Sequence, residues 1–223
     1  MKREVLILAI GALVASQAMA DPVQVGTAFV YSIGPGAWTS YGWTGETLVQ
    51  TSGLDGVDTD LRTFCLELSE DVAFGELSDA TISTEALAGG TGHVDTGPSG
   101  YGDLLSPATA WLYDQYLKDL LPGAGSAAEK ARDVQLAIWY LEDEIDDLTA
   151  YGVAEDLAEL AITSAGPDTG TYRVMNVWEL GTYPPPDHFL QDFIVSVVPL
   201  PGACLLGLLG LGAAGVKLRK RCA

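Results

Sequence analysis

The sequence predicts an α+β protein, a β-sandwich with an inserted helical lobe, flanked by an N-terminal signal peptide and a C-terminal transmembrane helix. Three observations carry this prediction. Runs rich in β-branched and aromatic residues lie at both ends of the central region, a block with helical spacing lies between them, and an apolar segment stands near each end of the chain. The expected boundaries are 1–20 for the signal peptide, 21–197 for the domain, with its helices at about 105–165, and 198–223 for the tail.

The first 20 residues have the three parts of a secretory signal peptide. Lys2 and Arg3 form a positive start, Val5–Val14 is an apolar core, and Ala18-Met19-Ala20 is a small-residue cleavage site. We therefore expect the protein to be exported.

The charge of the central region is strongly acidic. The whole chain has 30 acidic and 11 basic residues, a net charge of −19. Setting aside 1–20 and 202–223 removes one acid and six bases, which leaves 29 acidic against 5 basic residues, or −24. Such a surface repels nucleic acid and anionic membranes, so we expect no nucleic-acid partner.

Strands are predicted in the first part of the domain. Val23–Tyr31 reads as a strand, Gly34-Pro35-Gly36 as a turn, and Ala37–Gln50 as a hairpin. Leu61–Leu68 alternates, with Phe64, Leu66 and Leu68 on one face and Thr63, Cys65 and Glu67 on the other. Ala88–Gly102 is rich in Gly, Ser and Thr and is expected to be a loop.

Three helices follow, and then two strands. Ser106 and Pro107 start a helix that ends near Leu121, and Ser126 with Glu129 forms a capping box for a helix from Ala127 to about Asp147. Its predicted core stripe is Ala131, Val134, Ile138, Leu141 and Ile145. The third helix is expected at 154–163, and the strands at 171–180 and 189–198.

The tail combines a turn, an apolar run and a basic end. The run from Gly202 to Val216 would span roughly 22 Å as a helix, short of the ~30 Å hydrocarbon core of a bilayer. Because Pro residues stop the helix from extending backwards, the segment can span a membrane only marginally, as suits a removable anchor. The motif before the run is Val198, Pro199, Leu200 and Pro201, and the basic stop after it is Lys217, Arg219, Lys220 and Arg221.

This layout resembles the PEP-CTERM sorting signal in its VPLP variant, with Leu200 where the family name has Glu. The resemblance implies an exosortase-like membrane transpeptidase as a partner, which cuts near the motif. It also implies a protein held transiently in the inner membrane by its C-terminal helix, then released to the cell surface or extracellular matrix, in a bacterium of Gram-negative type. An ordinary C-terminal membrane anchor is the alternative interpretation.

Removal of the tail would change the cysteine count. Cys204 and Cys222 lie in the tail, so the mature protein would keep Cys65 alone. A single thiol in an oxidising compartment has no internal disulfide partner. We therefore expect Cys65 to be buried, paired with another molecule, or committed to other chemistry.

Two short strings in the domain resemble the thioester domains of bacterial surface adhesins. They are Thr63-Phe64-Cys65-Leu66 on a strand and Val134-Gln135-Leu136-Ala137-Ile138-Trp139 on a helix, with Val134 where that family has Thr. The resemblance implies that Cys65 is the thiol and Gln135 the acyl donor of an internal thioester. It also implies that Phe64, Ala137, Ile138 and Trp139 surround the bond.

The chemistry of such a pair can be argued from first principles. A thiolate that attacks the Gln side-chain carbonyl releases ammonia and leaves a thioester, provided that the groups are held at contact distance and water is kept out. The bond would then react with an amine-bearing surface partner. The protein would act as a single-use crosslinker rather than a turnover enzyme, with no cofactor.

The residues leave other interpretations open. A noncovalent structural or glycan-binding matrix module would bind exopolysaccharide through Trp38, Tyr41 and Trp43 and keep Cys65 as a core residue. A cysteine hydrolase is a weaker alternative, because no nucleophile-loop signature surrounds the thiol.

No metal site is expected. His93 and His188 form no metal spacing with other ligands, and the acidic turn Leu54–Asp60 lacks EF-hand spacing. We expect the acidic run at 142–147 to be a solvated helix end.

Overall fold

The computed structural model describes residues 25–87, 102–123, 125–183 and 189–198. The segments predicted as signal peptide (1–20), as a loop (88–101) and, from Pro199 onward, as the sorting tail lie outside these ranges. Within the described ranges, no helix is both long and apolar enough to cross a membrane.

The main sheet has six antiparallel strands in the order β3-β2-β1-β4-β7-β8. Their bounds are Gly26–Thr39 (β1), Gly42–Ser52 (β2), Asp60–Thr63 (β3), Leu77–Ser83 (β4), Tyr172–Glu179 (β7) and Phe189–Ser196 (β8). A two-stranded sheet joins β5 (Glu85–Leu87) to β6 (Gly102–Leu104).

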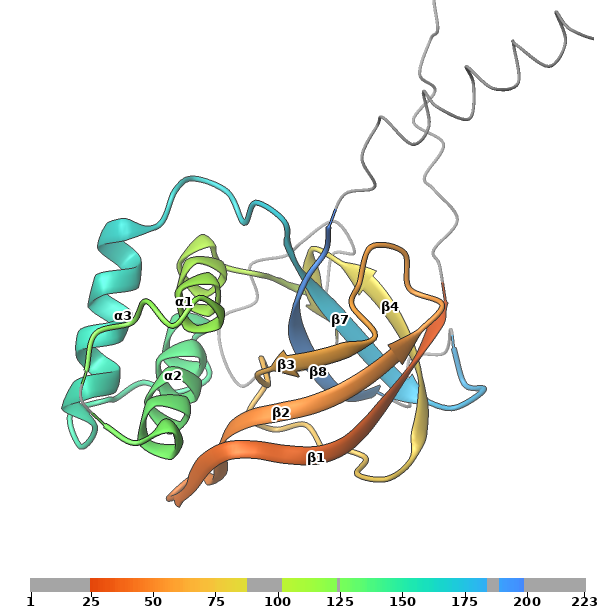
Figure 1. Ribbon diagram of the computed structural model, residues 1–223, viewed down its shortest axis with the longest axis horizontal. Coiled ribbons are helices and arrows are strands. Elements are labelled where there is room, and N and C mark those ends of the chain that lie inside the picture. The colour runs from red at the N-terminus through yellow and green to blue at the C-terminus, as the bar shows by residue number, and fades with distance from the viewer. Residues whose placement is uncertain (1–24, 88–101, 124, 184–188, 199–223) are drawn as a thin grey trace, which may run out of the picture.

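The two ends of the six-stranded sheet meet. β8 and the residue that follows it form isolated antiparallel bridges to the chain on either side of β3, at Cys65↔Phe193 and Val57↔Val197. The sheet therefore curls around an inner core, as Figure 1 shows. This core consists of Ala28, Val30, Val49, Leu54, Leu61, Ala80, Met175, Val177, Phe193 and Val195. The two β layers expected of a sandwich are the two halves of this one curled sheet.

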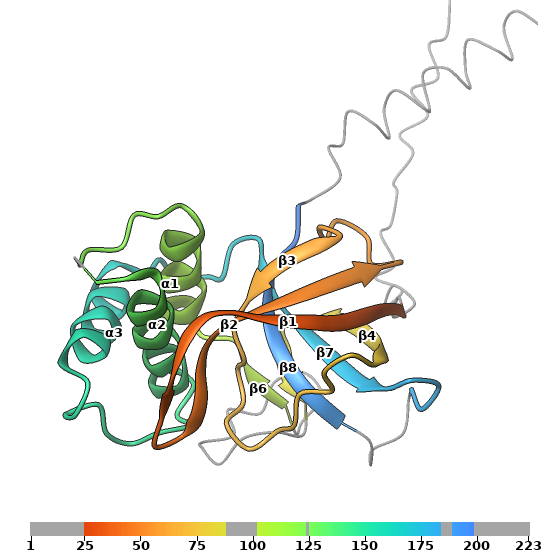
Figure 2. The ribbon, with the colours of Figure 1, turned by 60° about the horizontal axis from the view of Figure 1, so that its bottom comes forward.

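The helical lobe lies on one side of the sheet (Figures 1 and 2). It consists of α1 (Pro107–Leu117), α2 (Ala127–Leu141) and α3 (Gly152–Ser164), as the sequence predicts for the insert. Ser106 caps α1 by accepting the Thr109 N–H, and Ser126 forms the predicted capping box with Glu129. α2 is central, because it packs against both other helices and against β1 and β2.

Several boundaries differ from those predicted. β1 continues through Gly34-Pro35-Gly36, where the register shifts, and the hairpin turn lies between Thr39 and Gly42 instead. Gly42 has a φ of +94°, which a residue without a Cβ adopts readily. α2 ends at Leu141 rather than near Asp147, and Asp143 takes a left-handed conformation at φ +59°. The strands β4, β5 and β6 were not predicted.

Candidate functional site

Cys65 lies two residues after the end of β3, where its neighbours bond to β8. The Ile194 N–H donates to the Phe64 carbonyl at 3.2 Å. The Leu66 N–H donates to the Asp192 carbonyl at 2.9 Å. Because successive residues of a strand direct their backbone groups to opposite edges, the N–H and C=O of Cys65 face away from β8.

On the side that faces away from β8, the backbone of Cys65 has no pairing with β2. The β2–β3 ladder begins at Thr47↔Thr63 and runs to Gln50↔Asp60. Before Thr47, β2 pairs with β1, and the hairpin extends along α2 (Figure 2). A gap in the ladder therefore lies beside Cys65, on the side where α2 packs.

The side chain of Gln135 fills this gap. Its Nε2 donates to the Cys65 carbonyl oxygen at 2.7 Å, and its Oε1 accepts the Cys65 N–H at 3.0 Å. The two bonds fix which end of the carboxamide is oxygen, because a backbone N–H only donates and a carbonyl only accepts. The carboxamide thus takes the place of a peptide unit in the missing strand, and Gln135 is only 1% exposed.

The thiol has an environment that keeps it protonated. Cys65 is a free cysteine with its residue half-buried. Burial raises the pKa of its thiol to about 12, with a smaller contribution from the charge of Glu70, while a hydrogen bond from the Thr47 side chain acts in the opposite direction. Thr47 therefore contacts the sulfur from β2 and would stabilise a developing thiolate.

This arrangement has the parts needed for acyl transfer. An attack of the Cys65 sulfur on the side-chain carbonyl carbon of Gln135 would place negative charge on Oε1. That oxygen already accepts the backbone N–H of Cys65, in the manner of an oxyanion hole. Cys65 supplies the sulfur, and its backbone N–H and C=O bond the carboxamide of Gln135. The attacking sulfur and the side-chain carbonyl of Gln135 are therefore held near each other by one residue.

The other residues of the two strings are buried around the pair. Phe64, Ala137 and Ile138 are fully buried, and Phe64 packs edge-on against two tyrosines of α1. Trp139, one helical turn after Gln135, is 4% exposed and meets the ring of Tyr41 at 6.3 Å between centroids. The indole is thus held between α2 and the β1–β2 hairpin.

A group of carboxylates next to this site, three of them buried and one half-buried, was not predicted as a site. It comprises Glu67, Glu70, Glu144 and Asp192. Glu144 accepts the Leu68 N–H at 3.0 Å, and Glu70 Oε2 accepts the Asp192 N–H at 3.0 Å. Asp192 is fully buried, and its two carboxylate oxygens accept backbone N–H groups of β5 and β7.

Burial and neighbouring charges raise the pKa values of Glu67, Glu70 and Asp192. Burial, with the charges of Glu144 and Asp192, raises the pKa of Glu67 to about 10. Burial raises the pKa of Glu70 to about 7, opposed by its bond to the Asp192 N–H. The pKa of Asp192 is raised well above its ordinary value by burial and the charge of Glu70. At neutral pH Glu67 is therefore protonated, while Glu70 is divided between its two forms.

The sequence held a signal for this group. Asp192 interrupts an apolar strand, and Glu67 and Glu70 follow directly after the cysteine string. The expectation of a solvated helix end at 142–147 was wrong for two residues, because Glu142 and Glu144 are only 7% and 5% exposed. Both carboxylates turn inward to accept backbone N–H groups of neighbouring segments.

The remaining predicted sites are placed as follows. No group of three or more His, Cys, Asp or Glu within the described ranges could hold a metal ion. Trp38 is 78% exposed at the hairpin tip, with the ring of Trp43 at 6.1 Å. Val198 is half exposed, and its N–H donates to the Gly56 carbonyl at 2.8 Å. The rest of the sorting motif, the basic stop and both histidines lie outside the described residues.

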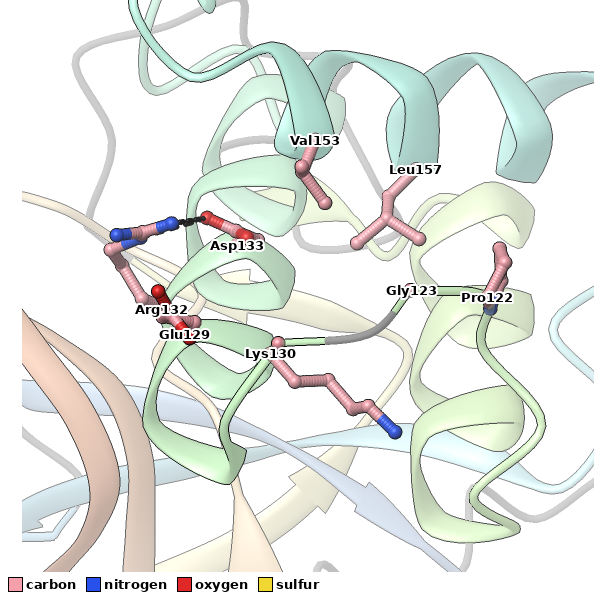
Figure 3. Close-up of a pocket in the computed structure, with 9 residues that line it drawn as sticks. Pro122, Gly123, Glu129, Lys130, Arg132, Asp133, Val153 and Leu157 are labelled. Carbon is pink, nitrogen blue, oxygen red and sulfur yellow. Dashed lines mark hydrogen bonds and ion pairs between the residues drawn. The ribbon is translucent and has the colours of Figure 1, made fainter.

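A separate hollow of about 150 Å³ lies in the helical lobe, between the chain before α2 and the start of α3 (Figure 3). Its polar side chains are largely paired, because Arg132 bonds Asp133 at 2.6 Å and Lys130 bonds Asp119 at 2.7 Å. None of the residues of the cysteine–glutamine pair lines it, so it is not part of the candidate site.

Comparisons with known proteins give little further information. No family model and no curated protein matches the chain. Among solved structures, the chain is similar to the N-terminal thioester domain of a surface protein from Clostridium perfringens, with 11% sequence identity and a TM-score of 0.45 over 78% of this chain and 99% of the other.

Proposed function

We propose that this protein is an exported surface or matrix protein whose domain forms an internal thioester between Cys65 and Gln135 and then attaches covalently to an amine-bearing partner. The observation that supports this proposal is the pair of hydrogen bonds between the Gln135 carboxamide and the Cys65 backbone. A glutamine that served only as a helix-flank residue would have no reason to be buried with its carboxamide against the residue that carries the thiol.

The contacts of the site support formation of the bond. The sulfur attacks the side-chain carbonyl carbon of Gln135, and the negative charge on Oε1 is stabilised by the Cys65 N–H. Collapse of the adduct breaks the C–N bond, and the nitrogen leaves as ammonia. The contact from Thr47 orients the sulfur and offsets part of the cost of burial.

The second step is attachment. A primary amine of a partner attacks the thioester carbonyl carbon, which frees the Cys65 thiol and leaves an amide on the side chain of residue 135. The net charge of −24 in the region without signal peptide and tail attracts cationic amines, such as lysine-rich surfaces or amino sugars. Because the thiol is released once per molecule, the protein acts as a single-use crosslinker.

The sequence of the tail supports a route to the surface. We propose that the signal peptide directs export, and that the segment from Gly202 to Val216 anchors the chain transiently in the inner membrane. An exosortase-like transpeptidase then cuts near Val198-Pro199-Leu200-Pro201. The cut would place the domain at the cell surface or in the extracellular matrix.

A second candidate function is favoured by the hairpin tip. Trp38 is 78% exposed beside Trp43, and exposed aromatic rings stack on sugar faces. On this alternative the domain binds exopolysaccharide without a covalent bond.

An amine probe tests the first proposal against the second. The full-length chain is incubated with a biotinylated primary amine and digested, and the label is located by mass spectrometry. We expect one label, on residue 135, with one newly reactive thiol at Cys65. Cys65→Ala and Gln135→Glu should take up no label. Labelling that survives Cys65→Ala would contradict the thioester proposal, and polysaccharide binding lost only in Trp38→Ala would support the second candidate.

A further inference from the structure

Thioester formation requires the movement of a proton. The sulfur must lose one, and the departing nitrogen must gain one. Burial raises the pKa of the Cys65 thiol to about 12, so the thiolate is scarce at neutral pH. The backbone groups that hold Gln135 do not exchange protons, so a side chain must accept the proton while the sulfur–carbon bond forms.

The carboxylate of Glu70 is placed next to this step. After Leu66 the regular backbone pairing with β8 ends, and the side chain of Glu70 bonds β8 in its place. Its Oε2 accepts the Asp192 N–H at 3.0 Å, a group that a continuing strand would have bonded. Phe193, the next residue of β8, forms the bridge with Cys65. Glu70 is therefore anchored one residue from the partner of the cysteine.

The second oxygen of Glu70 has no hydrogen-bond partner within the described part of the chain. Oε1 is buried and accepts no donor there. Leaving a buried carboxylate oxygen unsatisfied is costly, so its retention calls for a reason. Glu70 and Leu66, the residue after Cys65, both bond the backbone of Asp192, since the Leu66 N–H donates to the Asp192 carbonyl at 2.9 Å and the Asp192 N–H donates to Glu70 at 3.0 Å, so the carboxylate lies on the same stretch of β8 as the cysteine.

We propose that Glu70 accepts the thiol proton of Cys65 while the sulfur attacks Gln135, and then gives this proton to the departing nitrogen. The proposal rests on the thioester function. The S–H and C–N bonds break, and the S–C bond and one N–H bond form. Ammonia leaves, Glu70 returns to its ionised form, and no outside reactant is needed.

The neighbours of Glu70 tune it for both roles. The groups that face it are Glu67 on its own segment, Glu144 after α2, Asp192 on β8 and the thiol of Cys65. Burial and the charge of Glu144 raise the pKa of Glu70 to about 7, where a group serves best as base and then acid near neutral pH. Glu67, with a pKa of about 10, is protonated at this pH and cannot take the proton.

Two isosteric variants separate the roles of these carboxyl groups. Glu70→Gln keeps an oxygen to accept the Asp192 N–H but removes the base. Glu67→Gln makes the same change in the same segment, at a group that is already neutral. The thioester of each full-length protein is opened with ammonium, which restores the thiol and the carboxamide. After removal of the ammonium, re-formation is followed by intact mass, and circular dichroism monitors folding.

We expect re-formation to slow by roughly 100-fold or more in Glu70→Gln and by less than about threefold in Glu67→Gln. In the wild type the rate should fall as the pH drops below about 7, and Glu70→Gln should lose this dependence. Equal rates in the wild type and a folded Glu70→Gln would overturn the role of Glu70. If that variant does not fold, a wild-type rate that is flat through pH 7 would overturn it. Absence of any thioester in the wild type would instead overturn the proposed function.

Discussion

Removal of the Gln135 carboxamide tests how strongly it holds the open edge beside Cys65. The perturbation is Gln135→Ala, made on a Cys65→Ala background so that no covalent bond forms in either protein. The backbone of residue 65 still presents the same N–H and C=O. The variant therefore differs from its parent by the carboxamide and the side-chain methylene that carries it.

The magnitude follows from the two hydrogen bonds, at 2.7 and 3.0 Å, which both lie in a buried site. Each backbone group left without a partner costs about 1 to 3 kcal/mol. The lost methylene and the small cavity add about 1 kcal/mol. We expect the free energy of unfolding to fall by about 3 to 7 kcal/mol.

Urea unfolding of the full-length proteins measures this change. Gln50→Ala is the matched control, because Gln50 is exposed and bonds the Asp60 side chain at 3.0 Å, and its loss should cost less than about 0.5 kcal/mol. A loss below about 1 kcal/mol in Gln135→Ala would refute the argument, since it would mean that the carboxamide does not replace a strand at this edge.

Three further predictions follow from the same contacts. The raised pKa values of Glu67, Glu70 and Glu142 mean that these groups bind protons more tightly in the folded state than in the unfolded chain. Their contribution to the free energy of unfolding is therefore fully present below about pH 4.5 and declines as the pH rises through about 7. Urea titrations at several pH values should show this decline, and stability that rises between about pH 5 and 7 would contradict the burial of these groups. Thr47→Val removes the hydroxyl that bonds the sulfur but keeps the shape of the side chain, so thioester re-formation should slow about 10-fold in the intact-mass assay. Thr47→Ser keeps the hydroxyl, and its rate should stay within about threefold of the wild type. Equal rates in the two variants would exclude a role for the hydroxyl. Trp38→Ala should leave the melting temperature and amine labelling unchanged, because the ring is 78% exposed, and a large fall in stability would show that the hairpin tip is part of the core.

The helical lobe could be predicted closely because its signals are local. Ser106 and Ser126 cap their helices where the sequence places them, and the stripe on α2 from Ala131 to Ile138 is buried. The end of α2 was misjudged, since its periodicity continues to Ile145 although the helix stops at Leu141. Helical spacing of apolar residues indicates which residues are buried. Ile145 keeps this spacing although it lies in the loop after α2, so the spacing alone does not mark where the helix ends.

The closure of the sheet could not be predicted, because it depends on contacts between distant segments. The bridge between Cys65 and Phe193 joins residues that are far apart in the chain, and nothing local marks it. Gly34-Pro35-Gly36 carries a strong turn signal, yet β1 absorbs it as an irregularity of register within a long hairpin. Tertiary pairing overrides local preference at this point.

The candidate site was partly visible in the sequence. The strings around Cys65 and Gln135 identified the pair, and the structure adds that the carboxamide meets the backbone of the cysteine. The position of Glu70 after the cysteine string was visible in the sequence, but its contact with β8 was not, because that contact depends on where the segment after Leu66 lies relative to Asp192. Which carboxylates are buried is known only once the positions of the surrounding segments are known, because these carboxylates bond segments that are distant in the chain.

The mass of the intact full-length chain distinguishes a domain that contains the Cys65–Gln135 thioester from one that does not. An internal thioester predicts a mass lower by one ammonia than the sequence requires, after allowance for any signal-peptide removal, with the deficit lost in Cys65→Ala. Digestion should then recover the Cys65 and Gln135 peptides joined to each other. A chain at its full mass, with Cys65 open to alkylation in the folded state, would contradict the thioester and leave Gln135 as a structural substitute for a strand.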